Sequence, residues 1–466
     1  MFTQRPATLT CWLKGLLHLL KPKSNNKQNY LALSRKINLL QASAINMIDM
    51  VGIGPFVVMP LVVSYFDNGL FLWAWIFGAF TAFIDAMIWS ELGSAYPLAG
   101  GSYNFLRIGY GKKWGRMMSF LFVWQTCIQA PLVVASGAIG FAQYLSYIID
   151  MSWLQQKLVS GGLVIMVFIL LYRKIETIGK ISVALWIVVI LTVVWIIVSG
   201  LSHIRHSVRL APIGEESFFQ YAFWAAIGQG SVKTVYSYLG YYNVCHLGGE
   251  IKRPERNISR SMFISVAGIS ILYLLMNISV MSVISWQEIK PGDKHLVSIF
   301  MERIYGGWGG TVITVLILWI ALASLFAVVL GYSRIPYAAA VDGNFFQPFS
   351  KLHPTKNFPY VSLIFLCSLG FIFSLLLRLE KVIDSILAMR ILIQFIGQSV
   401  GLVLLRERAG TKSLPFKMWS YPVPVILSIC IWLFLFISTG WFALWGSLIA
   451  VGGVIVFFIS QNLNDK

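Results

Sequence analysis

The sequence predicts an all-helical membrane protein with twelve transmembrane helices. Of its 466 residues, 58% are hydrophobic and only 12% are charged, and the mean hydropathy is +0.75. A soluble domain carries about 25% charged residues. Apolar runs also recur along the chain, many of them near the roughly 20 residues that a helix needs to cross a bilayer. Two of the runs are interrupted by glycine, proline or polar residues, which favours a transport site in the membrane.

The apolar runs define the spans in order. The expected spans cover about residues 40–65, 69–96, 116–149, 153–172, 178–201, 217–244, 260–286, 308–340, 359–378, 384–405, 421–438 and 440–460. The chain is thus divided into a basic N-terminal segment (1–39), a transmembrane domain (40–460) and a short tail (461–466). The apolar patch Leu16-Leu-His-Leu-Leu20 is too short for a span. It suits either a segment lying on the inner leaflet or a disordered one.

Loop charges predict the orientation. With the N-terminus inside, 25 of the 36 Lys and Arg residues fall in inside segments. Cytoplasmic loops carry such an excess, so we expect a multi-pass protein of the cell membrane with both termini cytoplasmic. The formal net charge of +18 follows from this sorting and does not indicate a nucleic acid partner.

The sequence does not indicate an enzyme. The five cysteines and six histidines are scattered, so no metal site, disulfide framework or cofactor is expected. No nucleophile–base cluster accompanies them. The expected partners are the lipid bilayer, a small-molecule substrate and, depending on the mode of coupling, protons.

Two spans are broken near the middle of the membrane. The first contains Gly52-Ile53-Gly54-Pro55, and the second contains Tyr236-Ser-Tyr-Leu-Gly-Tyr-Tyr-Asn243. A free backbone group in lipid costs several kcal/mol, so such breaks persist only where protein or a cavity surrounds them. Spans 1 and 6 are each followed by four more spans, which favours a 5+5 inverted repeat with two added helices.

The two breaks offer complementary chemistry. Free amides beside a new helix starting near Pro55 suit a carboxylate. Carbonyls freed around Gly240, the expected hinge, suit an ammonium group. The plainer interpretations are a glycine packing notch in the first span and an aromatic cluster near an interface in the second.

Four motifs resemble those of the amino acid–polyamine–organocation (APC) superfamily. Met50-Val-Gly-Ile-Gly-Pro-Phe56 is similar to its first-span signature, and residues 91–103 to its motif after span 2. Residues 249–260 resemble its loop between spans 6 and 7, and residues 331–343 its end of span 8. The matches occur in the right order and cover spans 1 to 8.

The resemblance implies the leucine-transporter fold and alternating-access amino acid transport. It implies that amides of Gly52, Ile53 and Gly54 hold the substrate carboxylate. It also implies that carbonyls around Tyr236, Ser237 and Leu239 hold the amine, with Tyr236 as an aromatic gate. Tyr238 and Gly240 complete this substrate-binding stretch. The chain departs from the family where Ile53 replaces the usual serine and where Pro55 removes an amide.

Ionisable residues inside spans are candidates for coupling. Lys180 begins span 5. In this it resembles sodium-independent members of the superfamily, in which a lysine of span 5 occupies the place of a sodium ion. The resemblance implies that the Lys180 ammonium bonds carbonyls near Gly52. Snorkelling to the cytoplasmic surface is the alternative. Asp49 and Asp85 could pair with it, accept a proton or make a structural contact. Gln129 and Ser324 are further candidates for the cavity wall.

These observations predict a secondary active transporter of amino acids, working by sodium-independent exchange or proton-coupled uptake. A transporter of polyamines or other cationic amines is the nearer alternative, because Asp49 and Asp85 could meet a cation. A non-transporting membrane sensor on the same fold is the alternative of another class.

Overall fold

The computed structural model describes residues 33–66, 70–208, 210, 213, 218–290, 292–293, 295–377, 379–410 and 414–464. Within these residues the fold is helical, and it contains no strand beyond two isolated bridges, Ile37–Ile251 and Ala99–Leu247. The predicted all-helical class is therefore confirmed. The Leu16–Leu20 patch and most of the N-terminal segment lie outside the described residues.

The bounds of the elements follow in chain order. They are α2 (Leu39–Met50), α3 (Gly54–Val63), α4 (Phe71–Ala95), α5 (Ser102–Gly109), α6 (Gly111–Leu145), α7 (Trp153–Leu171), α8 (Ile175–Ser202), α10 (Tyr221–Tyr238), α11 (Asn243–His246), η1 (Gly248–Glu250), α12 (Pro254–Val283), η2 (Trp286–Glu288), α13 (Leu296–Tyr305), α14 (Gly307–Tyr332), α15 (Arg334–Val341), η3 (Gln347–Ser350), α16 (Tyr360–Leu376), α17 (Leu379–Arg390), the π-helical turn η4 (Ile391–Ile396), α18 (Gly397–Ala409), α19 (Val423–Ser438) and α20 (Trp441–Asn464).

Each expected span coincides with one helix or a run of helices. In the described part of the chain, eight helices are long and apolar enough to cross a membrane, and the bent pair α2 and α3 makes up to nine. Two shorter apolar helices, α16 and α19, add to these. The helix α20 continues to Asn464, into the segment that the sequence analysis treats as a tail.

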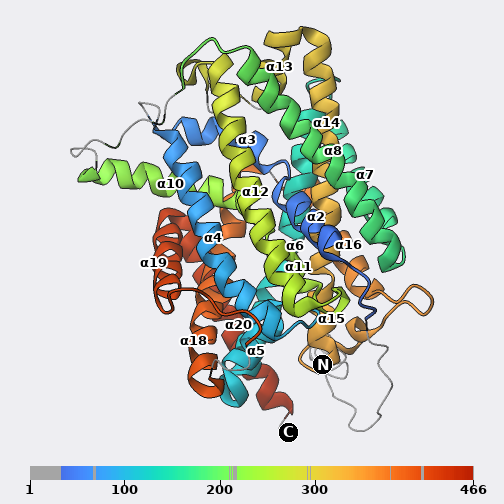
Figure 1. Cartoon of the computed structure of the whole chain (residues 1–466). Helices are drawn as coiled ribbons and strands as arrows, with labels where there is room; N and C mark the ends of the chain where they lie inside the picture. The colour runs from blue at the N-terminus through green and yellow to red at the C-terminus, as the bar shows by residue number, and fades with distance from the viewer. Residues whose placement is uncertain are drawn as a thin grey trace, which may run out of the picture.

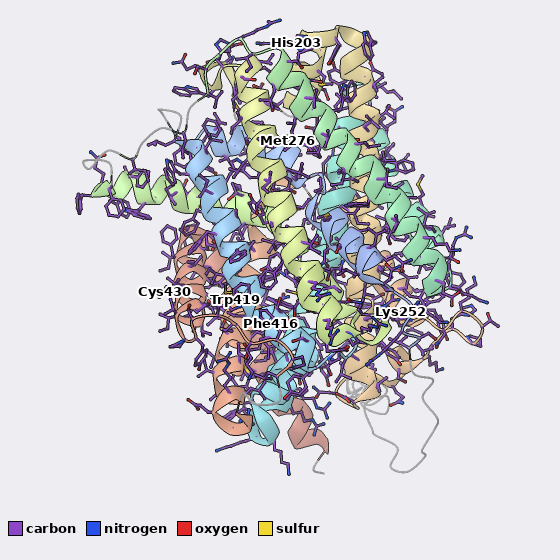
Figure 2. All side chains as sticks on the ribbon, in the orientation of Figure 1. His203, Lys252, Met276, Phe416, Trp419 and Cys430 are labelled. Atoms are coloured by element: carbon purple, nitrogen blue, oxygen red, sulfur yellow. The ribbon has the colours of Figure 1, made fainter. Side chains whose placement is uncertain are left out.

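The helices around the breaks pack against several neighbours: α2 contacts α8, α12 and α14, and α10 contacts α3 and α4. Helix α12 packs against α2, α4 and α8, while α6 packs against α14, α16 and α17. Figure 1 shows α13 at one end of the molecule and α5 and α15 at the other. His203 and Lys252, labelled in Figure 2, lie toward these opposite ends. The two ends correspond to the outside and the inside that the loop charges predict.

The segment that precedes α2 is held by backbone hydrogen bonds to Glu250. The amides of Lys36 and Ile37 both donate to the Glu250 carbonyl, at 2.9 and 3.0 Å. Asn38 then caps α2, accepting from the amide of Gln41 at 2.9 Å. These bonds attach the start of the first broken helix to the segment that follows the second, which fixes the two relative to each other.

Candidate functional site

The first break separates α2 from α3. The two helices meet at an angle of 43° around Val51, Gly52 and Ile53. The Gly52 amide donates to the Met50 carbonyl at 3.0 Å. The amides of Ile53 and Gly54 have no acceptor among the described residues, and they point out of the N-terminus of the ten-residue helix α3. This is the arrangement that binds an anion at a helix N-terminus.

The second break separates α10 from the short helix α11. Leu239 leaves helical geometry, and Gly240 has φ +122°, a conformation that residues with a side chain rarely adopt. The Gly240 carbonyl accepts from the Asn243 amide at 2.9 Å, which closes the turn. Glycine is needed here for space as well, because an added Cβ would lie 2.8 Å from the Met50 amide nitrogen.

Two side chains, those of Asn243 and Tyr273, connect the two breaks by hydrogen bonds. The Asn243 side-chain amide donates to Asp49 Oδ2 at 2.8 Å and to the Ala327 carbonyl at 2.7 Å. The hydroxyl of Tyr273, on α12, lies 2.8 Å from the Met50 carbonyl and 3.2 Å from the Ser237 carbonyl. Part of the polar backbone exposed by the unwinding is thus satisfied by protein, as a membrane interior requires.

A cavity of about 60 Å³, measured as the space open to the centres of water molecules, lies between the breaks. Such a volume holds only a few waters, since one water needs about 10–15 Å³ on this measure. Nine of the predicted site residues line it: Asp49, Gly52, Ile53, Gly54, Tyr236, Ser237, Leu239, Gly240 and Ser324. The two interrupted segments, about 190 residues apart in sequence, therefore share one cavity.

Four other predicted residues lie outside the cavity wall: Tyr238, Gln129, Asp85 and Lys180. Tyr238 packs edge-on against Trp75 and Tyr273, at ring distances of 6.2 and 5.2 Å. Gln129 is buried on α6 and is not part of the lining. Neither residue is part of the lining, although Gln129 lies next to Tyr332, which is; their contact with the substrate stays a prediction.

Asp85 also lies away from the cavity. Its carboxylate accepts from the Tyr241 hydroxyl at 2.5 Å and from Trp432 Nε1 at 3.3 Å. Tyr241 belongs to the second break, so Asp85 contacts that break from outside the cavity. This matches the structural contact that the sequence analysis gives as one of its alternatives.

Lys180 is exposed, which differs from the position beside Gly52 that the resemblance implies and fits the alternative of a surface position. Its neighbours Ile178, Gly179 and Ser182 are buried, and an added Cβ on Gly179 would lie 2.8 Å from Gln41 on α2. Successive helical residues point about 100° apart. The side of α8 that faces α2 therefore carries Gly179, and Lys180 does not line the cavity with Gly52.

The cavity contains a cation, Arg390, that is not among the predicted site residues. Arg390, at the end of α17, is 2% exposed and lines the wall together with Tyr242 and Tyr332. Its guanidinium donates to Gln394 Oε1 at 3.0 Å and to the Tyr332 hydroxyl. It also lies over the rings of Tyr242 and Tyr332, 5.1 and 5.5 Å from their centroids. In the sequence, the one indication of a functional role for Arg390 is its position inside an expected span.

Arg390 forms no ion pair with any described residue. An arginine has five N–H donors, and the two bonds above use two of them. A buried charge without a partner is costly. One cavity wall therefore contains the Arg390 guanidinium, the free amides of Ile53 and Gly54 and the Asp49 carboxylate, a set of groups that suits a solute bearing both charges.

Several ion pairs lie at the end of the bundle that the loop charges predict to be cytoplasmic. Arg406 on α18 makes two bonds of 2.5 and 2.6 Å with the buried Glu91 on α4, and Arg334 bonds the buried Glu250 at 2.9 Å. Arg107 pairs with Asp342 and donates to the Tyr103 hydroxyl at 3.0 Å. Burial raises the pKa of Tyr103 to about 12, so this hydroxyl stays neutral. Elsewhere, Lys233 on α10 pairs with Asp384 on α17.

Comparisons with known proteins place the chain in a family. The amino acid permease family model matches residues 37–462. The serine/threonine exchanger SteT of Bacillus subtilis (strain 168) is 26% identical over 85% of this chain and 89% of the relative. The branched-chain amino acid permease BcaP of the same organism is 20% identical over 97% and 98%. The human cystine/glutamate transporter is 24% identical over 90% and 83%. The chain therefore belongs to the amino acid permease family of the APC superfamily.

Proposed function

We propose that this protein carries an amino acid across the cell membrane by alternating access, with the cavity between the two breaks as the substrate site. The observation that carries the proposal is the position of the charges around that cavity. The free amides of Ile53 and Gly54 suit a carboxylate, and Asp49 suits an ammonium group. The Arg390 guanidinium offers a further site for an anionic group of the substrate. The relatives are named for serine and threonine, for branched-chain amino acids, and for cystine and glutamate. These compounds differ in their side chains, but all of them are amino acids.

The moving unit in this proposal comprises α2 with α3, α4, α10 with α11, and α12. The Tyr273 hydroxyl and the Asn243–Asp49 bond hold the two breaks together within it. The buried pairs Glu91–Arg406 and Glu250–Arg334 connect its inside end to α18 and α15. Opening toward the cytoplasm breaks these pairs, and opening toward the outside leaves them intact. All twelve predicted spans take part, with both termini on the cytoplasmic side.

Arg390 supports transport without sodium. A resident guanidinium in the cavity repels a second cation, and its charge is available to balance a substrate carboxylate. We therefore propose that Arg390, and not Lys180, supplies the resident positive charge of the site. Exchange of one amino acid for another, or uptake with a proton on Asp49, is compatible with this arrangement.

Arg390 also affects which substrates the cavity favours. A polyamine carries only positive groups, so the buried guanidinium opposes it and the cationic-amine alternative is less favoured. A substrate with a second carboxylate would gain a charge-assisted pair with the three unused N–H donors. We propose acidic amino acids as preferred substrates within the class.

The test is solute flux in proteoliposomes that contain the purified protein. We expect accumulation of radiolabelled amino acid when unlabelled amino acid is loaded inside, in buffers without sodium. A pH gradient tests the proton-coupled mode, which requires faster uptake from the acidic side. Absence of flux under all these conditions, with amino acid binding retained, would favour a membrane sensor. Competition by putrescine and not by any amino acid would favour the polyamine alternative.

A further inference from the structure

The surface of the helical bundle carries a second cavity with a different chemistry. It lies where α7 ends and α8 begins, and its volume is about 490 Å³. Three cations line it: Arg173 and Lys174 from the connection between the helices, and Lys356 from the loop before α16. Among the residues that the structure describes, no carboxylate is part of the lining.

One of these cations is held in place. Lys356 Nζ donates to the Tyr172 carbonyl at 2.9 Å and lies 4.3 Å from the centre of the Tyr172 ring. The carboxylate that follows in sequence, Glu176, is engaged elsewhere, at 3.2 Å from Lys36 Nζ. The basic cavity therefore keeps its positive charge, and it suits an anionic group with several oxygen acceptors.

An apolar groove continues from the basic cavity. Its volume is about 430 Å³, and it runs between α7 and α16, which pack side by side (Figure 1). Phe168 lines both spaces, so the groove begins where the cations end. Ile165 on one wall and Ile364 and Ile372 on the other are 44–51% exposed, as expected of side chains that face lipid.

The dimensions suit a chain of methylene groups below a charged group. Ile165 and Tyr172 are seven residues apart on or beside α7, which corresponds to about 10 Å along the helix axis. The basic end lies on the side that the loop charges predict to be cytoplasmic, where the leaflet is rich in anionic lipids. A headgroup phosphate at Arg173, Lys174 and Lys356 would thus have its acyl chain in the groove.

We infer that this composite surface binds an anionic phospholipid of the cytoplasmic leaflet. The phosphate is held by the three cations, and one acyl chain lies between α7 and α16. The site is separate from the substrate cavity, so the inference does not depend on the transported solute. Because α16 packs against α6, whose Ser136 bonds the Tyr236 hydroxyl at 3.1 Å, the lipid contacts a part of the bundle next to the proposed gate.

The test uses the purified full-length protein, titrated with dioleoyl phosphatidylglycerol, with dioleoyl phosphatidylcholine and with inorganic phosphate. Bound adducts are measured by native mass spectrometry. We expect the phosphatidylglycerol adduct to form at the lowest concentration. In a variant that combines Arg173→Gln, Lys174→Gln and Lys356→Gln, its apparent affinity should fall about tenfold or more. Lys351→Gln is the matched control, because Lys351 is exposed in the same loop as Lys356 but does not line the cavity.

A second variant tests the groove. Ser368 is exposed and lines the groove, so Ser368→Trp fills it without disturbing the core. We expect weaker phosphatidylglycerol binding and an unchanged melting temperature. Equal binding of both lipids, or an equal loss in Lys351→Gln, would show general surface attraction and overturn the inference. Phosphate binding as tight as that of the lipid, with no effect of Ser368→Trp, would show an anion site without a lipid and also overturn it.

Discussion

The Tyr273 hydroxyl lies 2.8 Å from the Met50 carbonyl, in the last turn before the first break. It also lies 3.2 Å from the Ser237 carbonyl at the end of α10. A single side chain on α12 thus contacts the freed backbone of both breaks. We interpret Tyr273 as the residue that keeps the breaks unwound together, because its hydroxyl satisfies carbonyls that would otherwise face a membrane interior.

Tyr273→Phe tests this interpretation. The ring contact with Trp75, at 5.5 Å, is retained, so the main change is the loss of the hydroxyl. We expect a loss of unfolding free energy of about 1–3 kcal/mol, from carbonyls left without a donor. We also expect weaker amino acid binding. Tyr305→Phe is the control, since it loses a bond to the Ser199 hydroxyl in another part of the bundle. Equal effects of the two variants on amino acid affinity would contradict the account.

Arg390→Gln should change substrate preference. In the wild type we expect an acidic amino acid to compete for uptake about tenfold or more better than its amide, aspartate against asparagine and glutamate against glutamine. The variant should lose this difference while it still binds neutral amino acids through the amides of Ile53 and Gly54. Arg205→Gln, in the loop after α8, should behave as the wild type. Equal competition by acid and amide in the wild type would rule out Arg390 as the side-chain receptor.

The buried pair Glu91–Arg406 should stabilise the state in which the inside end is closed. Glu91→Gln leaves the Arg406 guanidinium buried without its partner, which costs about 3–5 kcal/mol of unfolding free energy. The double variant Glu91→Gln with Arg406→Gln should lose less than the sum of the single losses. Chemical unfolding of the four proteins measures this coupling.

The exposed pair Glu288–Arg303 serves as the control for that cycle. The hydrogen bond from Arg303 holds the pKa of Glu288 below its ordinary value, so any contribution to stability is present at neutral pH and lost as the pH falls through that lowered pKa. Solvent screens this pair, and its removal should have a much smaller effect. A loss at Glu91 no larger than that at Glu288 would contradict a role in closure.

Lys180→Ala separates the two candidates for the resident cation. Because Lys180 is exposed and does not line the cavity, we expect uptake within about twofold of the wild type, as for other surface substitutions. Its pH dependence should also be unchanged. Abolished or uncoupled transport in this variant, with normal folding, would return the coupling role to Lys180.

The sequence was sufficient for the helical class and for the positions of both breaks, because glycine, proline and polar residues inside apolar runs act locally. Which side of a helix faces the cavity depends on packing. Hydropathy placed Lys180 near the end of a span, but the neighbour Gly179 occupies the contact with α2. Arg390 could be placed within a span, and its direction depends on α17 packing against α6 and α10. For the same reason Asp85 could not be matched with Tyr241, 156 residues later.

The central claim is that the cavity between the breaks binds an amino acid, and Gly54 gives its most direct test. A Cβ at this position would lie 3.2 Å from the Tyr236 ring and 3.4 Å from Ser237 Oγ, so a larger side chain fills the cavity. Gly162→Leu on α7 is the matched control, because an added Cβ there meets nothing within 4 Å. The measurement is the thermal shift of purified protein with a panel of amino acids and polyamines, with and without sodium. We predict a shift by an amino acid without sodium in the wild type and in Gly162→Leu, and none in Gly54→Leu. The same shift in Gly54→Leu, with a normal melting temperature, would contradict the account.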